Sequence, residues 1–217
     1  MAHVADFCID RFEAHLVLVD EVGANGVHPS NRPVGRAKVR AASARGVLPQ
    51  AYVSYEDARA ACDRAGKRLC RRAEWRRACR GSVDTKYPYG DRRRRDHCND
   101  AGVEPLAALH GRTSEATWGF DVMNDPALHL VPGSVARTGR FTRCASEEGV
   151  FDLVGNLHEW IDDPEGTLVG GFFLDTESLG RGCDYEAIGH DARYRDYSTS
   201  FRCCADTRSS PRPSPAR

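Results

Sequence analysis

The 217-residue sequence has no long apolar run, no net charge and no C-x-x-C pair. None of its apolar runs approaches the roughly 18 residues that a membrane-spanning helix needs. Its 31 basic and 31 acidic residues balance, which removes the electrostatic attraction of a basic protein for nucleic acid. The basic run at 92–95 is predicted to be a solvated loop. We therefore expect no membrane span and no nucleic-acid partner.

Nine cysteines are many for this length, and without a C-x-x-C pair the usual zinc-ribbon pattern is missing. Scattered cysteines in a loop-rich chain indicate disulfides and an extracytoplasmic location, either periplasmic or secreted. The first residues show neither the charged nor the apolar segment of a signal peptide. A cytoplasmic protein with reduced, metal-binding cysteines therefore stays the alternative.

The segment 149–163, G-V-F-D-L-V-G-N-L-H-E-W-I-D-D, combines apolar residues with carboxylates. A segment this apolar is expected to be buried, and a buried carboxylate needs a partner or a cation. Asp152 and Glu159, on either side of a glycine turn, are oxygen ligands of the kind that calcium takes, with backbone carbonyls completing the shell. From these residues alone, the favoured interpretation is a strand, a turn and a helix start, with Glu159 paired with an arginine.

Regular elements are predicted on both sides of a long irregular region. Residues 7–13 alternate as a half-buried strand, and 38–45 indicate a short basic helix. Ser54 is the expected N-cap of a helix that stops at Gly66, and a second helix is expected over 72–80. Strands are expected over 167–173, with a glycine bulge, and over 200–204.

The region 81–142 shows little periodicity, and such a stretch is usually held by ligands, metals or disulfides. Cys98 and Cys144 bracket most of it, so we expect them to form a disulfide. The Ser-, Pro- and Arg-rich residues 209–217 are expected to be a disordered tail after a domain over 1–208.

Taken in order, these segments resemble the formylglycine-generating enzyme, or sulfatase-modifying factor, family. The matching pieces run from about residue 7 to 204. They are F-C-I-D-R-F-E, V-S-Y-E-D-A-R-A-A-C-D-R-A-G-K-R-L-C-R-R-A-E-W-R-R-A-C-R-G, Y-P-Y-G-D, C-N, G-V-F-D-L-V-G-N-L-H-E-W, V-G-G-F-F and F-R-C-C. The resemblance implies an α+β fold, a single compact C-type-lectin-like domain with much irregular chain.

The resemblance also implies metal ligands and disulfides. An interior calcium would be held by the side chains of Asp152 and Glu159 and the carbonyls of Gly155 and Leu157. A second calcium would use Asn99. The implied disulfides are Cys62–Cys203 and Cys79–Cys183. Cys8, Cys70 and Cys204 stay unassigned, and the odd count leaves at least one cysteine unpaired.

The resemblance fails where the family's oxidase chemistry resides. That oxidase uses two cysteines that bind copper(I), four and nine positions after the second glycine of a G-G-S strand. Here those positions are Asp175 and Gly180, and the serine is Phe172. Cys183 is the one cysteine between Gly171 and Arg202, and one thiol cannot make a bis-thiolate site.

We therefore expect a family member without copper chemistry that binds a peptide, glycan or protein partner. The alternative is an active formylglycine-generating-type oxidase, or an enzyme with altered chemistry that uses Cys183 or Cys204. The expected pocket lies near the place where the thiols are missing. Its residues are Phe172, Phe173, Asp175, His190 and Tyr194.

Overall fold

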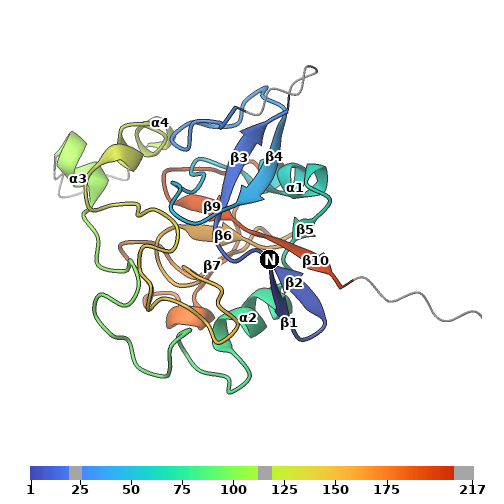
Figure 1. Cartoon of the computed structure of the whole chain (residues 1–217). Coiled ribbons are helices and arrows are strands. Elements are labelled where there is room, and N and C mark those ends of the chain that lie inside the picture. The colour runs from blue at the N-terminus through green and yellow to red at the C-terminus, as the bar shows by residue number, and fades with distance from the viewer. Residues whose placement is uncertain (20–25, 112–118, 208–217) are drawn as a thin grey trace, which may run out of the picture.

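The computed structural model describes residues 1–19, 26–111 and 119–207. Over these ranges the chain forms an α+β domain of three small sheets, with helices packed around them and long irregular connections (Figure 1). The expected tail at 209–217 lies outside the described residues. No helix in the described ranges is both long and apolar enough to cross a membrane.

The first sheet joins the two ends of the described chain. Its strands are β1 (Ala2–Val4), β2 (Phe7–Ile9), β10 (Cys203–Asp206) and β5 (Arg68–Leu69), in that order across the sheet. All its pairings are antiparallel, and Cys204 of β10 faces Ile9 of β2 in the register. The strand predicted over 7–13 is correct at its start, and the chain leaves it after Ile9.

A hairpin-like sheet follows, made of β3 (Ala14–Leu18) and β4 (Val39–Ser43). The short helix predicted over 38–45 is wrong, because β4 occupies this segment. Val39 and Ala41 are buried while Arg40 between them is partly exposed, and this alternation is the pattern of a half-buried strand. Pairing with β3 overrides the basic composition that indicated a helix.

The third sheet carries the segment 149–163. Its order is β8 (Glu186–Ala187), β7 (Leu168–Val169), β6 (His158–Trp160) and β9 (Thr199–Phe201). The β6–β9 pair is parallel and the other pairs are antiparallel. The helix start expected within 149–163 is therefore wrong, because the segment ends in β6.

Two helices agree with the prediction. The first, α1 (Tyr55–Arg64), begins after Ser54, whose hydroxyl accepts a hydrogen bond from the Asp57 amide at 3.2 Å. The second, α2 (Arg72–Arg80), buries Trp75, Ala78 and Cys79. These two helices cover different parts of the core, since α1 packs in a cluster with β3 and β4 and α2 packs in a cluster with β1 and β2.

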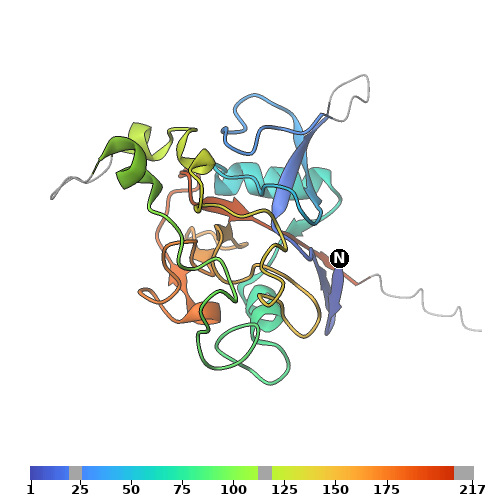
Figure 2. The same ribbon diagram turned by 60° about the vertical axis from the view of Figure 1, so that its left-hand side comes forward.

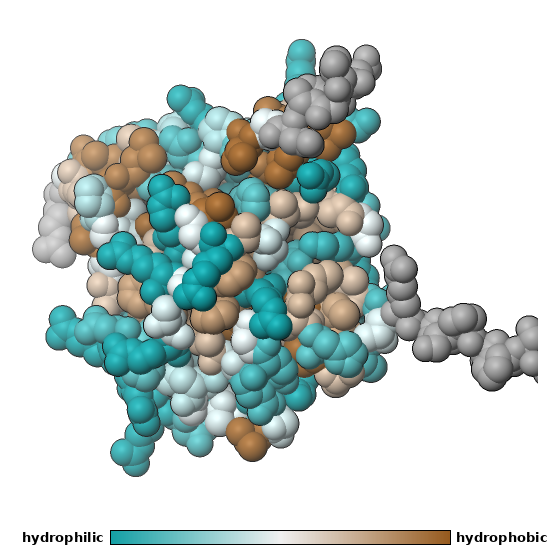
Figure 3. Space-filling view, in the orientation of Figure 1, coloured by the Kyte–Doolittle hydropathy of each residue, from teal (hydrophilic) through white to brown (hydrophobic). Residues whose placement is uncertain are grey.

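The region 81–142 contains short helical elements that the sequence did not predict. They are α3 (Pro105–His110), α4 (Phe120–Met123) and the 3₁₀ turn η1 (Leu128–Leu130). The lobe with α3 and α4 projects from the sheets (Figure 2), and apolar side chains gather on its surface (Figure 3). Exposed examples are Leu109, Phe120 and Leu130. A second 3₁₀ turn, η2 (Gly182–Asp184), follows later in the chain.

Disulfides hold the early helices to the late chain. Eight of the nine cysteines are bridged, and Cys8 on β2 is the free one. Three bridges are pairs expected from the resemblance or from the flanking positions, and the fourth joins two cysteines that had no assigned partner. The pairs are Cys62–Cys203, Cys79–Cys183, Cys98–Cys144 and, fourth, Cys70–Cys204.

Candidate functional site

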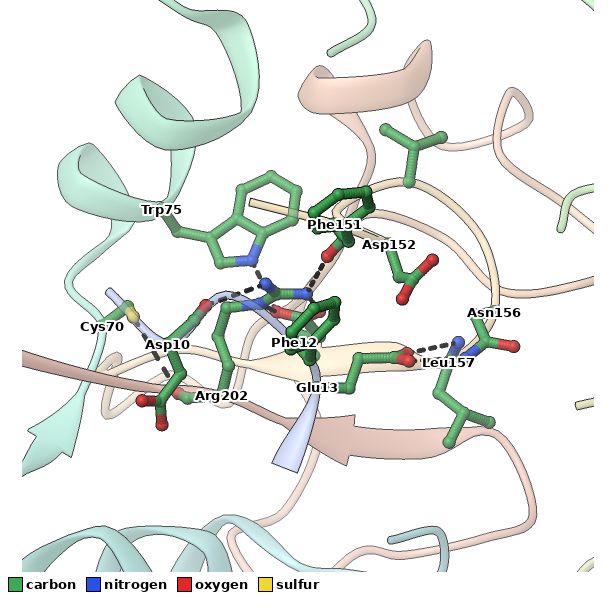
Figure 4. Close-up of polar contacts among 12 residues, drawn as sticks. Asp10, Phe12, Glu13, Cys70, Trp75, Phe151, Asp152, Asn156, Leu157 and Arg202 are labelled. Atoms are coloured by element: carbon green, nitrogen blue, oxygen red, sulfur yellow. Dashed lines mark hydrogen bonds and ion pairs between the residues drawn. The ribbon is translucent and has the colours of Figure 1, made fainter. Parts of the chain in front are cut away.

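A fully buried arginine lies at the centre of the segment that the sequence singled out. Arg202, which links β9 to β10, donates to both carboxylate oxygens of Glu159, from Nε at 2.7 Å and from Nη2 at 2.5 Å. Its remaining bonds go to the backbone carbonyls of Asp10 and Phe151 (Figure 4). Arg202 is completely inaccessible to solvent and Glu159 nearly so. The pair is therefore a buried, bidentate salt bridge.

Glu159 has a third hydrogen-bond donor. The indole Nε1 of Trp75, on α2, donates to its Oε2 at 2.8 Å. The Glu159 carboxylate thus joins helix α2, strand β6 and the closing strand in one polar contact inside the core. The arginine pairing favoured from the residues alone is what the structure shows for Glu159.

Two further carboxylates approach the same arginine. Glu13 accepts from the Leu157 amide at 3.1 Å and from the Asn156 side chain at 2.5 Å. Asp152 accepts from the Gly139 amide at 2.6 Å. Burial, together with the neighbouring Asp152 and Glu159 charges, raises the pKa of Glu13 well above its usual range. Burial also raises the pKa of Asp152, to about 6.

Asn99 belongs to an adjacent amide network. Its side-chain Nδ2 donates to the backbone carbonyl of Ser134 and to Asn156 Oδ1, both at 2.9 Å. The backbone carbonyl of Asn99 accepts from the backbone N–H of Asn156 at 2.8 Å. Gly155, beside Asn156, has a φ of +77°, and a Cβ there would lie 2.2 Å from the Asn99 carbonyl oxygen. Only glycine permits this close approach of the two chain segments.

The contacts of Glu159 fit a guanidinium better than calcium. Both its oxygens already accept from cationic or indole donors. The described residues contain no group of three or more His, Cys, Asp or Glu side chains arranged to hold a metal ion. A shell made mainly of backbone carbonyls from Gly155 and Leu157 would not need such a group. Calcium at these residues, and at Asn99, stays a prediction.

The loop after β7 is where the resemblance would place the two thiols of the family's oxidase, and Asp175 organises this loop. Its Oδ1 accepts from the amides of Glu177 and Ser178 at 2.9 and 3.0 Å, and its Oδ2 accepts from the hydroxyls of Ser178 and Tyr185. Burial opposes ionisation, but these hydrogen bonds outweigh it and lower the pKa of Asp175. These hydrogen bonds occupy both oxygens of the carboxylate and stabilise the turn.

Gly180 has no room for any side chain. Its φ is +117°, and a Cβ built on it would lie 2.2 Å from the carbonyl oxygen of Asp184. Because that neighbour is backbone, it cannot move aside as a flexible side chain would. The nearby Cys183 is bonded to Cys79 of α2. The backbone at position 180 of this loop therefore leaves no space for a cysteine side chain.

An aromatic and histidine cluster covers this loop. The buried His158 ring of β6 lies 4.7 Å from the Phe172 ring and 5.5 Å from the Tyr185 ring, measured between centroids. Burial lowers the pKa of His158 to about 3, so the imidazole is neutral at physiological pH. Its Nδ1 is buried and makes no hydrogen bond among the described residues. In a neutral imidazole, each nitrogen donates or accepts one hydrogen bond according to the tautomer, and Nδ1 of His158 has this capacity unused.

The structure divides the five expected pocket residues into separate groups. Phe172 and Asp175 form a backbone bridge beside His158. The rings of His190 and Tyr194 lie 4.8 Å apart between centroids and are tilted by 50°, and the Tyr194 hydroxyl donates to Asp196. Phe173 is completely buried in a core cluster with Tyr197. Phe173 thus has no surface to offer a pocket, while Phe172, whose ring lies 5.3 Å from that of Phe173, packs against the same cluster and stays partly exposed.

Sequence reasoning missed two groups in this region. Arg202 and Glu13 both lie within the quoted motifs F-R-C-C and F-C-I-D-R-F-E. A single charge flanked by apolar residues and cysteines was a signal that each side chain is buried and therefore paired. The pairing itself joins residues far apart in the chain, which no local pattern contains.

Comparisons with known proteins agree with this architecture. A family model described as the sulfatase-modifying factor enzyme 1-like domain matches residues 2–212. A formylglycine-generating enzyme of Thermomonospora curvata is 46% identical over 191 residues, covering 73% of this chain and 55% of that protein. One from Mycobacterium tuberculosis is 34% identical over 112 residues, covering 52% of this chain and 32% of that protein. The chain spans about half or less of the length of these relatives.

Solved structures give weaker likenesses. The Major Tropism Determinant U1 variant has a TM-score of 0.49 at 14% identity, covering 94% of this chain and 51% of that chain. Treponema denticola variable protein 1 has a TM-score of 0.47 at 14% identity, covering 95% and 93%. Because the family model matches nearly the whole chain, the chain belongs to the sulfatase-modifying factor enzyme 1-like family.

Proposed function

We propose that this chain is a sulfatase-modifying-factor-like protein that does not oxidise cysteine with copper and that binds a peptide, glycan or protein partner. The observation that carries the first part is the Gly180 backbone, whose φ and contact with the Asp184 carbonyl leave no space for a thiol. Copper(I) in such a site needs two soft thiolate ligands. Asp175 supplies a hard carboxylate that is already hydrogen-bonded.

The alternative function, an enzyme that uses Cys183 or Cys204, would need a free thiol at one of these positions. A reactive cysteine must be free and partly exposed. In the structure Cys183 is bonded to Cys79 and Cys204 to Cys70, and all four are buried. Cys8 lies on β2, in a different sheet from the loop after β7.

The binding part rests on the cluster of His158, Phe172 and Tyr185. It combines a partly exposed aromatic ring with a buried imidazole nitrogen that has no hydrogen-bond partner within 1–19, 26–111 and 119–207. Aromatic surfaces beside a few fixed polar atoms are typical of recognition sites. Four disulfides support an oxidising, extracytoplasmic compartment for this binding.

The oxidase part is tested with purified protein loaded with copper(I), oxygen and a C-x-P-x-R peptide, followed by mass spectrometry of the peptide. We expect no aldehyde product. Conversion of the cysteine to formylglycine at a rate that follows copper occupancy would overturn the proposal.

The binding part is tested with fluorescently labelled protein on peptide and glycan arrays. We expect a ligand whose signal falls at least tenfold in Phe172→Ala and is kept in Phe120→Ala, an exposed aromatic on α4 that is not part of the cluster of His158, Phe172 and Tyr185. A signal that both variants keep would place recognition away from the loop after β7.

A further inference from the structure

A cavity of about 320 Å³ lies beside strand β3, apart from the loop after β7. Its volume is at the small end of the range for sites that bind small molecules. The residues that line it come from β3 and from three connections. They are His15, Val27, His28, Pro29, Ser30, Val47, Leu48 and Arg137.

One wall of the cavity is fixed by a completely buried glutamine. The Nε2 group of Gln50 donates to the carbonyls of Arg32 at 2.8 Å and Ala51 at 2.7 Å, and it also faces the carbonyls of Pro29 and Ser30. Carbonyls only accept, so they determine which way the amide is turned. Gln50 therefore holds the segment 28–32 in place without any ligand.

The orientation of Gln50 sets the proton on His28. Its Oε1 lies 3.1 Å from His28 Nδ1, and an amide oxygen can only accept, so Nδ1 carries a hydrogen and donates it. His28 is 93% buried, since 7% of its surface is exposed. The ring is thus held by its Nδ1 edge, and Nε2 is the polar atom on its other edge.

His15 supplies a second imidazole. Its Nδ1 is buried without a hydrogen-bond partner among the described residues. Burial and the nearby Arg40 lower the pKa of His15, while Asp10 opposes them. A buried polar atom without a partner costs free energy, and the imidazole that carries it is one of the groups that line the cavity.

The charge and polarity of the lining indicate the class of ligand. Among the described residues that line the cavity, Arg137 is the one with a permanent charge and none is a carboxylate. Its Nη1 donates to the Gly46 carbonyl at 3.1 Å, and a guanidinium has five N–H donors in all. Apolar walls come from Val27, Pro29, Val47 and Leu48.

We propose that this cavity binds a small organic carboxylate. The carboxylate pairs with Arg137, the apolar body packs against the valine, proline and leucine walls, and the two imidazoles provide hydrogen bonds that fix its orientation. This binding site is independent of the function proposed for the loop after β7.

The test is a titration of the ¹⁵N-labelled protein with sodium benzoate, followed by ¹H–¹⁵N correlation spectra. Benzamide, with the same shape and no charge, is titrated in parallel. We expect benzoate to shift amides in 27–30 and 47–48 in a saturable way, and benzamide to bind at least about tenfold more weakly, since charge-assisted hydrogen bonds contribute about 1.5–3 kcal/mol.

Arg137→Gln should weaken benzoate binding by at least about tenfold, and Arg140→Gln should leave it unchanged. Arg140 is an exposed arginine three positions along the same segment and does not line the cavity. Unchanged melting temperatures show that both variants fold. The proposal is overturned if benzoate causes no saturable shifts at these amides, if benzamide binds equally well, or if the two arginine variants behave alike.

Discussion

Replacing Arg202 by methionine is predicted to destabilise the domain more than almost any other single change. The guanidinium makes two bonds to Glu159 and one each to the Asp10 and Phe151 carbonyls, all inside the core. Without it, Glu159 is left as a buried carboxylate beside Glu13 and Asp152. Removing one partner of a buried ion pair costs about 3–5 kcal/mol.

The loss can be measured by guanidinium chloride unfolding without reductant, so that the bridges stay closed. For a domain of this size, about 3–5 kcal/mol corresponds to a fall in Tm of roughly 6–20 °C. Glu159→Gln added to Arg202→Met removes the unpaired charge, so the double variant should be more stable than Arg202→Met alone. A loss below about 1 kcal/mol, or a double variant with fully additive losses, would show that Arg202 is not the partner of this carboxylate.

The same samples distinguish the guanidinium from calcium. With Arg202 as the cation for Glu159, a chelator should leave the Tm of the unaltered protein unchanged. A fall in Tm on chelation that is reversed by added calcium would support the calcium prediction instead. Glu159→Ala should then also abolish the effect of the chelator.

Three further predictions concern other parts of the molecule. Asp175→Cys with Gly180→Cys should yield no copper-dependent oxidase and should lower the Tm, because a Cβ at 180 meets the Asp184 carbonyl; peptide oxidation by this variant would contradict that reading of the loop. Burial lowers the pKa of His129 to about 4. Between pH 6.5 and 4, this imidazole therefore takes up a proton in the unfolded chain, where its pKa is about 6.5, but not in the native protein. The free energy of unfolding should fall by about 3 kcal/mol as the pH decreases over this range. His129→Phe should reduce that fall by a similar amount in unfolding curves across this range, and an unchanged pH profile would refute it. Alkylation without reductant should label Cys8 alone, as read by peptide mapping, and label on Cys183 or Cys204 would contradict the observed bridges.

Much of the fold was predictable where the signal is local. Ser54 followed by Asp57 marks the start of α1, and the apolar spacing of Trp75, Ala78 and Cys79 marks the buried face of α2. The basic residues around β4 misled the prediction, because pairing with β3 is a contact between distant segments that composition does not encode.

The candidate site was predictable in its residues and not in its contacts. The segment 149–163 pointed to Asp152 and Glu159 as buried charges that need compensation. The identity of the compensating group depends on Arg202, which is 43 residues from Glu159 in sequence. The lack of space for a side chain at Gly180 is likewise a property of the folded backbone, because it depends on where the Asp184 carbonyl lies. The sequence shows that positions 175 and 180 are not cysteines. It does not show that the backbone at Gly180 leaves no space for a side chain.

The adjacent cysteines at the end of the domain set an order for its biosynthesis. Cys203 and Cys204 point to opposite faces of β10 and join two separate apolar clusters, through Cys62 and Cys70. The third bridge joins Cys79 to Cys183, which also comes late in the chain. Three of the four bridges therefore cannot close until nearly the whole domain has been synthesised, and Cys62, Cys70 and Cys79 can mispair until then. Efficient production should depend on a disulfide isomerase that acts after synthesis of the closing strand.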